Sequence, residues 1–169
     1  MSGPIAGVFF DFGDTLVVEE PGKHLWEMTL TPIPHALDLL AWLRPRVRVG
    51  IVSNTVGSGD ADVWQVVERA GMAPYVDALV TSRDFGTAKP DPAIFHEAAR
   101  RLGVPLGQTC MVGDRLETDI AGARAAGIPG VWLRHPHARA QPPIEAAHVI
   151  TDLSQLRDWI VAASAPGAR

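Results

Sequence analysis

The sequence has 169 residues, 47% of them hydrophobic and 20% charged, values that are typical of a single globular domain. The formal net charge is -4 and no cluster of Lys and Arg offsets it, so a nucleic acid is not an expected partner. The single cysteine, Cys110, excludes an internal disulfide. No basic segment precedes an apolar run at the N-terminus, and no stretch reaches the ~18 apolar residues of a membrane span. We therefore expect a cytoplasmic domain that does not interact with membranes.

The run from Ile5 to Phe10 is apolar without alternation, which predicts a strand buried on both faces of a parallel sheet. Ligands of open α/β sheets bind outside the carboxyl ends of such strands, and Asp11 stands there. Its carboxylate can be a metal ligand, a nucleophile or a polar cap on the next turn, and this stretch alone does not decide between them. The segment 17–31 is expected to be irregular, with Glu19 and Glu20 in a solvated turn.

The rest of the chain alternates strands and helices. We predict further strands over residues 47–52, 75–81, 109–112, 131–133 and 148–150, and helices over 35–44, 61–70, 92–102, 119–126 and 153–161. The expected N-caps are Asp60, Asp91 and Thr118. This alternation predicts an α/β fold with a doubly wound, mostly parallel, Rossmann-like sheet. We expect the core to occupy residues 1–161, followed by a frayed tail over 162–169.

Polar residues gather at one predicted edge of this sheet. They are Asp11 with Thr15, Ser53 with Asn54, Lys89 on a loop, and Asp114 followed by Asp119. Carboxylates from two strands can hold Mg²⁺, whereas a hydroxyl, an amide and an ammonium donate to phosphate oxygens. Each residue alone is better explained as a turn or cap residue. Their shared edge favours phosphoryl transfer.

Four ordered motifs resemble those of the haloacid dehalogenase-like (HAD) hydrolase superfamily. They are FDFGDTL over residues 10–16, VSN over 52–54, KP over 89–90 and VGDRLETD over 112–119. The resemblance spans residues 5 to 160 and implies a HAD-like fold. The intervals that carry cap domains in the family are short here, so it also implies a capless member with an open site and no separate cap domain.

The resemblance implies a role for each residue at the edge. Asp11 would attack phosphorus, become an aspartyl-phosphate and also bind Mg²⁺. Asp114 and the Gly13 carbonyl would be further metal ligands, and Asp119 would support the metal's waters or Lys89. The substrate-binding residues would be Thr15, Ser53, Asn54 and Lys89, of which Lys89 would also neutralise charge during catalysis. The substrate would be a small phosphorylated molecule or an exposed phosphate on a larger one, and the oligomeric state stays open.

One departure from the family pattern affects the expected activity. Phosphatases of the superfamily have a second Asp two residues after the nucleophile as general acid and base, whereas this chain has Gly13 there and Asp14 one position later. Whether Asp14 supplies the proton stays open. Two alternatives to a phosphatase remain: a dehalogenase with the same nucleophile, and a phosphate-binding module with little turnover. Keeping both Asp114 and Asp119 favours phosphate chemistry. His135 and His137 are too few for a zinc site and are expected to be loop residues.

Overall fold

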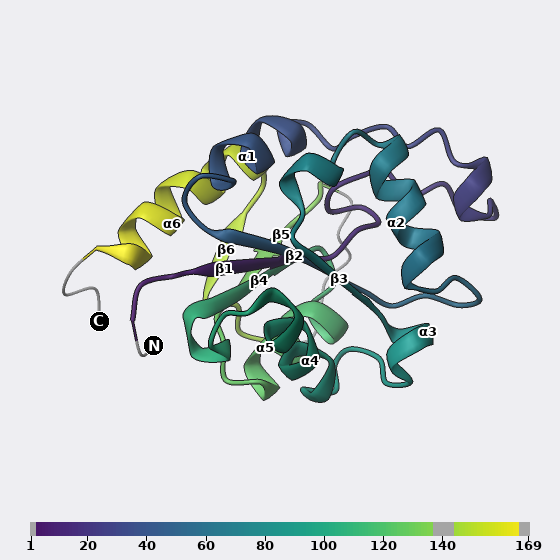
Figure 1. Ribbon diagram of the computed structural model, residues 1–169. Coiled ribbons are helices and arrows are strands. Elements are labelled where there is room, and N and C mark those ends of the chain that lie inside the picture. Colours follow the sequence, from purple (N-terminus) through teal and green to yellow (C-terminus); the bar gives the residue numbers. More distant parts are fainter. Residues whose placement is uncertain (1–2, 137–143, 166–169) are drawn as a thin grey trace.

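The computed structural model describes residues 3–136 and 144–165; His137 and the end of the expected tail lie outside these ranges. Six parallel strands form one sheet in the order β3-β2-β1-β4-β5-β6 (Figure 1). The strands are β1 (Gly7–Phe10), β2 (Arg48–Ser53), β3 (Ala78–Thr81), β4 (Thr109–Gly113), β5 (Gly130–Leu133) and β6 (His148–Ile150). The predicted doubly wound, Rossmann-like α/β fold is confirmed.

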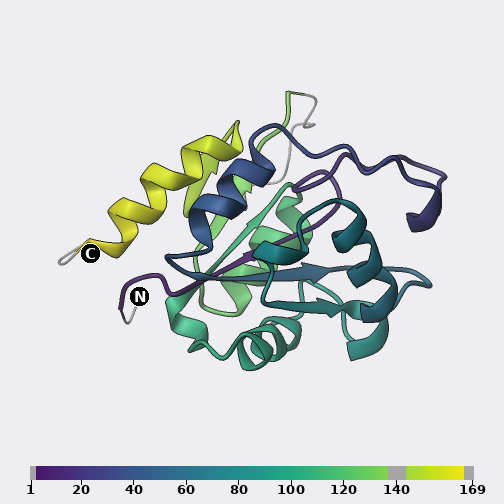
Figure 2. The same ribbon diagram turned by 45° about the horizontal axis from the view of Figure 1, so that its top comes forward.

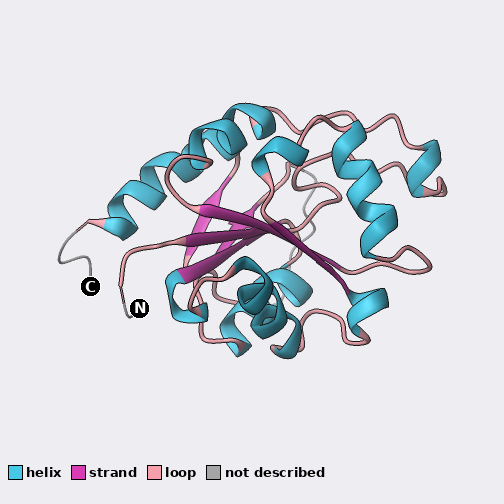
Figure 3. Cartoon of the chain, viewed as in Figure 1, coloured by secondary structure: helices cyan, strands magenta, loops and turns pink. Residues whose placement is uncertain are grey.

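Helices cover both faces of the sheet (Figure 3). On one face lie α1 (Ala36–Leu43), α2 (Asp60–Arg69) and α6 (Leu156–Ser164), and α1 and α6 run side by side in both ribbon views (Figures 1 and 2). On the other face lie α4 (Ala93–Leu102) and the short α5 (Ala121–Ala125). A further short helix, α3 (Ser82–Phe85), directly follows β3. None of the helices in residues 3–136 and 144–165 is long and apolar enough to cross a membrane.

The sheet separates two hydrophobic cores. Phe10 of β1 belongs to the core shared with α1, α2 and α6, whereas Phe9 belongs to the core shared with α4 and α5. Both phenylalanine side chains are fully buried. The unbroken apolar run of the first strand therefore serves both faces, as expected for a central parallel strand. β1 lies between β2 and β4, which places the residue after Phe10 at the middle of the carboxyl edge.

Several element boundaries differ from expectation. β3 begins only at Ala78, because Ala73–Tyr75 form a 3-10 turn that contains Pro74. α3 lies in a stretch expected to be a loop, and the Thr81 side chain accepts a hydrogen bond from the Asp84 backbone at its start. α6 continues to Ser164, so the first residues of the expected tail are helical.

Two of the expected N-caps have other tasks. α2 begins at Asp60 itself, and the Asp60 carboxylate instead accepts hydrogen bonds from the backbone and side chain of Thr81 in β3. Thr118 lies inside a π-helical turn, Leu116–Ile120, that directly precedes α5. The N-cap of α4 is Pro92 and not Asp91, because the helix begins one residue later than expected, but the Asp91 carboxylate still accepts a hydrogen bond from the Ala93 N–H at the first residue of α4.

Candidate active site

The carboxyl ends of three neighbouring strands bring the expected polar residues together. In the register of the sheet, Phe10 pairs with Ile51 of β2 and with Val112 of β4. The residues that follow these strands therefore meet at one edge, and the Asp11 N–H donates to the Val112 carbonyl at 3.0 Å. Lys89 reaches the same edge from the loop between α3 and α4. The topology thus places Asp11 next to groups from both sides.

Lys89 is the centre of a buried ion network. Its Nζ lies 2.8 Å from Asp11 Oδ1, 2.7 Å from Asp119 Oδ1 and 2.7 Å from the carbonyl oxygen of Val52. Its side chain is 1% exposed. Burial alone would lower the pKa of Lys89, but the charges of Asp11 and Asp119 outweigh burial and raise the pKa above its usual value. Lys89 therefore remains an ammonium beside the expected nucleophile.

Asn54 fixes the backbone of Lys89. The Asn54 Nδ2 donates to the Lys89 carbonyl and the Lys89 N–H donates to Asn54 Oδ1, each at 2.9 Å. The peptide bond between Lys89 and Pro90 is cis. The side-chain amide of Asn54, expected to face a phosphate, is thus occupied by the lysine loop. Asn54 and Ser53 both line the pocket above Asp11.

Three carboxylates form a compact acidic cluster. One oxygen from each of Asp11, Asp114 and Asp119 lies within 4.8 Å of the others. Burial, followed by the negative charges of Asp11 and Asp119, raises the pKa of Asp114 to about 7. Thr15, fully buried, donates from its hydroxyl to Asp114 Oδ1 at 3.3 Å, so it orients this carboxylate. Three acids against one lysine leave excess negative charge, and hard carboxylate oxygens are the ligands that Mg²⁺ prefers. The cluster therefore fits a divalent cation.

Asp119 supports Lys89 and the turn after β4. It is fully buried, it pairs with Lys89, and its Oδ2 accepts a hydrogen bond from the Arg115 N–H at 3.0 Å. Burial raises the pKa of Asp119, although the adjacent Lys89 opposes this change. A Cβ at position 113 would collide with the Asp119 carboxylate, which explains why glycine ends β4. Asp119 thus contacts Lys89 directly and braces the turn after β4.

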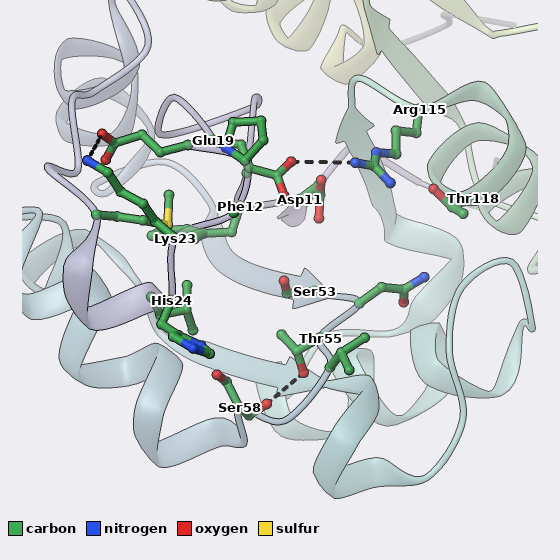
Figure 4. Close-up of a pocket in the computed structure, with 18 of the residues that line it drawn as sticks. Asp11, Phe12, Glu19, Lys23, His24, Ser53, Thr55, Ser58, Arg115 and Thr118 are labelled. Atoms are coloured by element: carbon green, nitrogen blue, oxygen red, sulfur yellow. Dashed lines mark hydrogen bonds and ion pairs between the residues drawn. The ribbon is translucent and has the colours of Figure 1, made fainter.

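A pocket of about 290 Å³ opens above Asp11. One wall consists of the strand ends, including Ser53, and of the Arg115 turn; the other is the segment from Glu19 to Leu25 (Figure 4). This segment continues into the 3-10 turn Leu25–Glu27, which lies beside α2 in both ribbon views. Arg69 of α2 holds it there by donating to the Trp26 and Met28 carbonyls, each at 3.3 Å.

Asp14 does not line this pocket. Its backbone has a left-handed conformation, with φ at 53°, and its Oδ1 accepts a hydrogen bond from the Glu19 N–H at 2.8 Å. The Asp14 carbonyl accepts a hydrogen bond from His135 Nε2 at 2.6 Å. His135 is thus a loop residue that supports the turn after β1, as expected. The carboxylate of Asp14 is used to hold the backbone of the next segment.

Part of the pocket wall is formed by residues not expected there from the sequence. Glu19 and Glu20, expected in a solvated turn, both line the pocket, as do His24 and Arg115. The Glu19 carboxylate faces Arg115, with 3.4 Å between Glu19 Oε2 and Arg115 Nη2 (Figure 4). These positions depend on how the chain returns after the Asp14 turn. No local pattern in the sequence encodes that path.

Residues 22–127 match the family model for haloacid dehalogenase-like hydrolase. The chain belongs to this family. It is 34% identical over 162 residues to pyrimidine 5'-nucleotidase YjjG of Escherichia coli, covering 91% of this chain and 70% of that protein. It is 41% identical over 106 residues to glyceraldehyde 3-phosphate phosphatase of Methanopyrus kandleri, covering 62% of this chain and 44% of that protein. The chain thus spans less than half the length of the second relative.

The fold is also found among solved structures. A crystal structure of an uncharacterized protein from Listeria monocytogenes superposes with a TM-score of 0.82 at 26% identity, covering 92% of this chain and 97% of that one. The predicted membership of the HAD hydrolase superfamily is therefore confirmed. Phosphatases and a nucleotidase are among the relatives, which agrees with the expectation of a hydrolase acting on phosphate esters.

Proposed function

We propose that the protein is a Mg²⁺-dependent phosphoric monoester hydrolase that works through an aspartyl-phosphate on Asp11. The observation that carries this proposal is the contact between Asp11 and a buried, charged Lys89 at the floor of an open pocket. An ammonium at 2.8 Å orients the carboxylate, and it offsets the charge of an approaching phosphate. The names of the relatives support the same reaction class.

In this reaction a carboxylate oxygen of Asp11 attacks phosphorus, and the bond between phosphorus and the leaving oxygen breaks. Lys89 binds Oδ1, which leaves Oδ2 as the attacking oxygen. Water then attacks the aspartyl-phosphate, releases inorganic phosphate and regenerates the carboxylate. Because Lys89 is fixed by Val52 and Asp119 as well as by Asp11, it has little freedom to move during either step.

Asp11 and Asp114 would hold the metal ion together with the carbonyl oxygen of Gly13. Bound Mg²⁺ would neutralise charge on the transferring phosphoryl group and orient it. In the proposal, Asp119 acts through Lys89 and through waters, and Thr15 acts by orienting Asp114. Burial, followed by the charges of Asp11 and Asp119, raises the pKa of Asp114, which is consistent with a site that needs a cation to hold all three carboxylates ionised.

The substrate in this proposal is a small phosphorylated molecule or an exposed phosphate on a larger one. Ser53 and the main chain of Asn54 would receive the phosphoryl oxygens. The pocket volume of about 290 Å³ leaves room beside the phosphate for a small leaving group. We propose that the segment from Glu19 to Leu25 takes the place of a separate cap domain, since it forms the wall opposite the strand ends.

Two alternatives make different predictions. A dehalogenase would use Asp11 on a carbon–halogen bond without needing the acidic cluster, and a binding module would hold phosphate without turnover. One observation favours the binding module: position 13 is glycine, and the Asp14 carboxylate accepts a hydrogen bond from the Glu19 N–H.

A screen separates the three possibilities. Phosphate esters and haloacids are offered with and without Mg²⁺, and Asp11→Asn serves as the nucleophile control because it is nearly isosteric. We expect turnover of phosphate esters that needs Mg²⁺ and is lost by several orders of magnitude in Asp11→Asn. Metal-independent halide release would instead identify a dehalogenase. Binding of phosphate without hydrolysis of any ester would identify a binding module.

A further inference from the structure

The position that lacks an acid faces another carboxylate. A Cβ built on Gly13 would lie 3.4 Å from Glu19 Oε2 and 3.5 Å from the carboxyl carbon of Glu19. Both residues line the pocket above Asp11. The side chain of Glu19 therefore lies against the open face of Gly13, in the region into which a side chain at position 13 would project. We propose that Glu19 is the general acid and base of the reaction; this inference rests on the proposed phosphatase function.

The turn after β1 is built to place Glu19 there. Asp14 adopts its left-handed conformation, donates from its N–H to the Val17 carbonyl at 2.7 Å, and accepts the Glu19 N–H on its side chain. Val18 donates to the Thr31 carbonyl at 2.8 Å, which fixes the chain directly before Glu19. With glycine at position 13 and aspartate at position 14, two different residues hold the turn and supply the carboxyl group in the pocket. Asp14 anchors a backbone, and the carboxyl group in the pocket comes from position 19.

The other groups on this wall are less suited to proton transfer. Glu20 is tied to its own loop, since its carboxylate pairs with Lys23 and accepts hydrogen bonds from Thr29. The His24 ring is stacked on Trp26, with 4.6 Å between ring centroids. Glu19 has only a loose partner: Arg115 Nη2 is 3.4 Å from its Oε2, and both side chains are about half exposed. Such exposed pairs contribute little energy, so the Glu19 carboxyl is free to turn toward a leaving oxygen.

The proton balance closes over the two steps. When Asp11 bonds to phosphorus and the leaving oxygen departs, the Glu19 carboxyl group gives its proton to that oxygen. When water attacks the aspartyl-phosphate, the Glu19 carboxylate takes a proton from the water. Asp11 is released as a carboxylate, inorganic phosphate departs, and Glu19 is again protonated for the next cycle.

The test compares leaving groups. Values of kcat/KM are measured with Mg²⁺ for a series from 4-nitrophenyl phosphate to simple alkyl phosphates. General acid catalysis is typically worth ~10²–10⁴-fold, most of it for poor leaving groups. Glu19→Gln should therefore lose ~10²–10⁴-fold on alkyl phosphates and only a few-fold on 4-nitrophenyl phosphate. The matched control is Glu27→Gln, which makes the same change in the adjoining 3-10 turn, outside the pocket lining, and keeps an acceptor for the His24 N–H.

A second variant tests whether the location of the carboxyl group is what matters. Gly13 does not have a positive φ, and a Cβ there has ordinary contact distances, so position 13 accepts aspartate. Gly13→Asp combined with Glu19→Gln should recover at least tenfold of the lost alkyl phosphate turnover.

An equal loss on all esters in Glu19→Gln, or no loss, would overturn the inference. If wild-type turnover depends on Asp11 but ignores Glu19, this inference alone fails; if no ester is hydrolysed and Asp11 is not phosphorylated, the proposed function fails with it.

Discussion

Lys89 is held in place largely by groups that do not contact the phosphate in the proposed reaction. Its ammonium contacts Asp11, Asp119 and Val52, while Asn54 binds its backbone on both the N–H and the carbonyl side. In the proposed reaction, the motif residues therefore divide into those that contact the phosphate and those that hold the contacting groups in place. Asn54 belongs to the second kind through its side chain, and Thr15 belongs there through its bond to Asp114.

Removing the Asn54 side chain should loosen Lys89 without removing it. We expect Asn54→Ala to lower kcat by ~10²-fold, because displacing a catalytic group by about 1 Å is typically this costly. The affinity for Mg²⁺ should change little, since Asn54 is not among the carboxylates of the cluster. Steady-state kinetics and Mg²⁺ titrations measure the two effects. A thermal melt run in parallel checks that the variant is folded, and near-wild-type kcat in a folded variant would contradict this role.

The Asp14 side chain holds the backbone of Glu19. Its Oδ1 accepts the Glu19 N–H, and an asparagine oxygen at the same place can accept this hydrogen bond as well. Asp14→Asn should therefore keep turnover within a few-fold for every leaving group. Asp14→Ala removes the acceptor and should reduce turnover of alkyl phosphates more than that of aryl phosphates. If Asp14→Asn alone abolishes alkyl turnover, then Asp14 itself is the acid.

The elements near the site are joined by one carboxylate. Asp60, the first residue of α2, accepts hydrogen bonds from Thr81 of β3 and pairs with Arg101 of α4. Arg101 also donates to the Leu79 carbonyl in β3 at 2.8 Å. The network ties a helix on each face of the sheet to the same edge strand. Burial raises the pKa of Asp60, but the hydrogen bonds from Arg101 and Thr81 outweigh this, so its pKa is lowered overall.

Because the pKa of Asp60 is lowered in the folded state, its ionised carboxylate stabilises the fold at pH values above the unfolded pKa of about 4. This stabilisation is lost as the pH falls through the folded pKa. Asp60→Asn should therefore lower the free energy of unfolding by about 1–2 kcal/mol at pH 7. The difference between the variant and the wild type should shrink at pH values below 4. Urea denaturation at several pH values measures it, with the exposed Asp38→Asn in α1 as control. A difference that is constant from pH 7 to pH 3 would contradict the charge network.

Helices and strands could be predicted where a local hydrophobic pattern encodes them. All six strands are visible as apolar runs, and helices α1, α2, α4 and α6 are visible from their spacing. The π-helical turn Leu116–Ile120 is not, because it depends on the Asp119 carboxylate folding back to the Arg115 N–H. Asp11, Lys89 and Asp114, in contrast, could be predicted, because they stand at strand ends or in recognisable motifs. Glu19 could not, because its position depends on the left-handed turn at Asp14 and on the Asp14 side chain that holds its N–H, which no pattern in the sequence indicates.

At the scale of the whole molecule, the sheet gathers acids from two strands and their loops at one edge. Burial and mutual repulsion raise the pKa of Asp114 to about 7, which means that its ionised form is disfavoured without a cation. Under the proposed function, the arrangement therefore lowers the stability of the metal-free protein in exchange for a metal site. This is the trade between stability and activity that is common at functional sites.

Removing one charge from the cluster should reveal this trade. Asp114→Asn should raise the Tm of the metal-free protein at pH 8 by a few degrees, because one of three repelling carboxylates is gone. Its response to Mg²⁺ should be lost, whereas the wild type should gain about 2.7 kcal/mol at a Mg²⁺ concentration 100 times the Kd. Thermal melts with EDTA and with Mg²⁺ measure both. A less stable Asp114→Asn variant that still responds fully to Mg²⁺ would show that the metal lies elsewhere.

The wall formed by Glu19 to Leu25 is fastened at separate points. Val18 is bound to Thr31 where the segment leaves and returns to the body of the protein, and Arg69 holds its far end to α2. Between these anchors the chain contributes nothing to the sheet. In the proposed phosphatase, the stretch from Pro21 to Leu25 can therefore be replaced without changing the ion network around Lys89, and such a replacement would change which leaving groups reach Asp11.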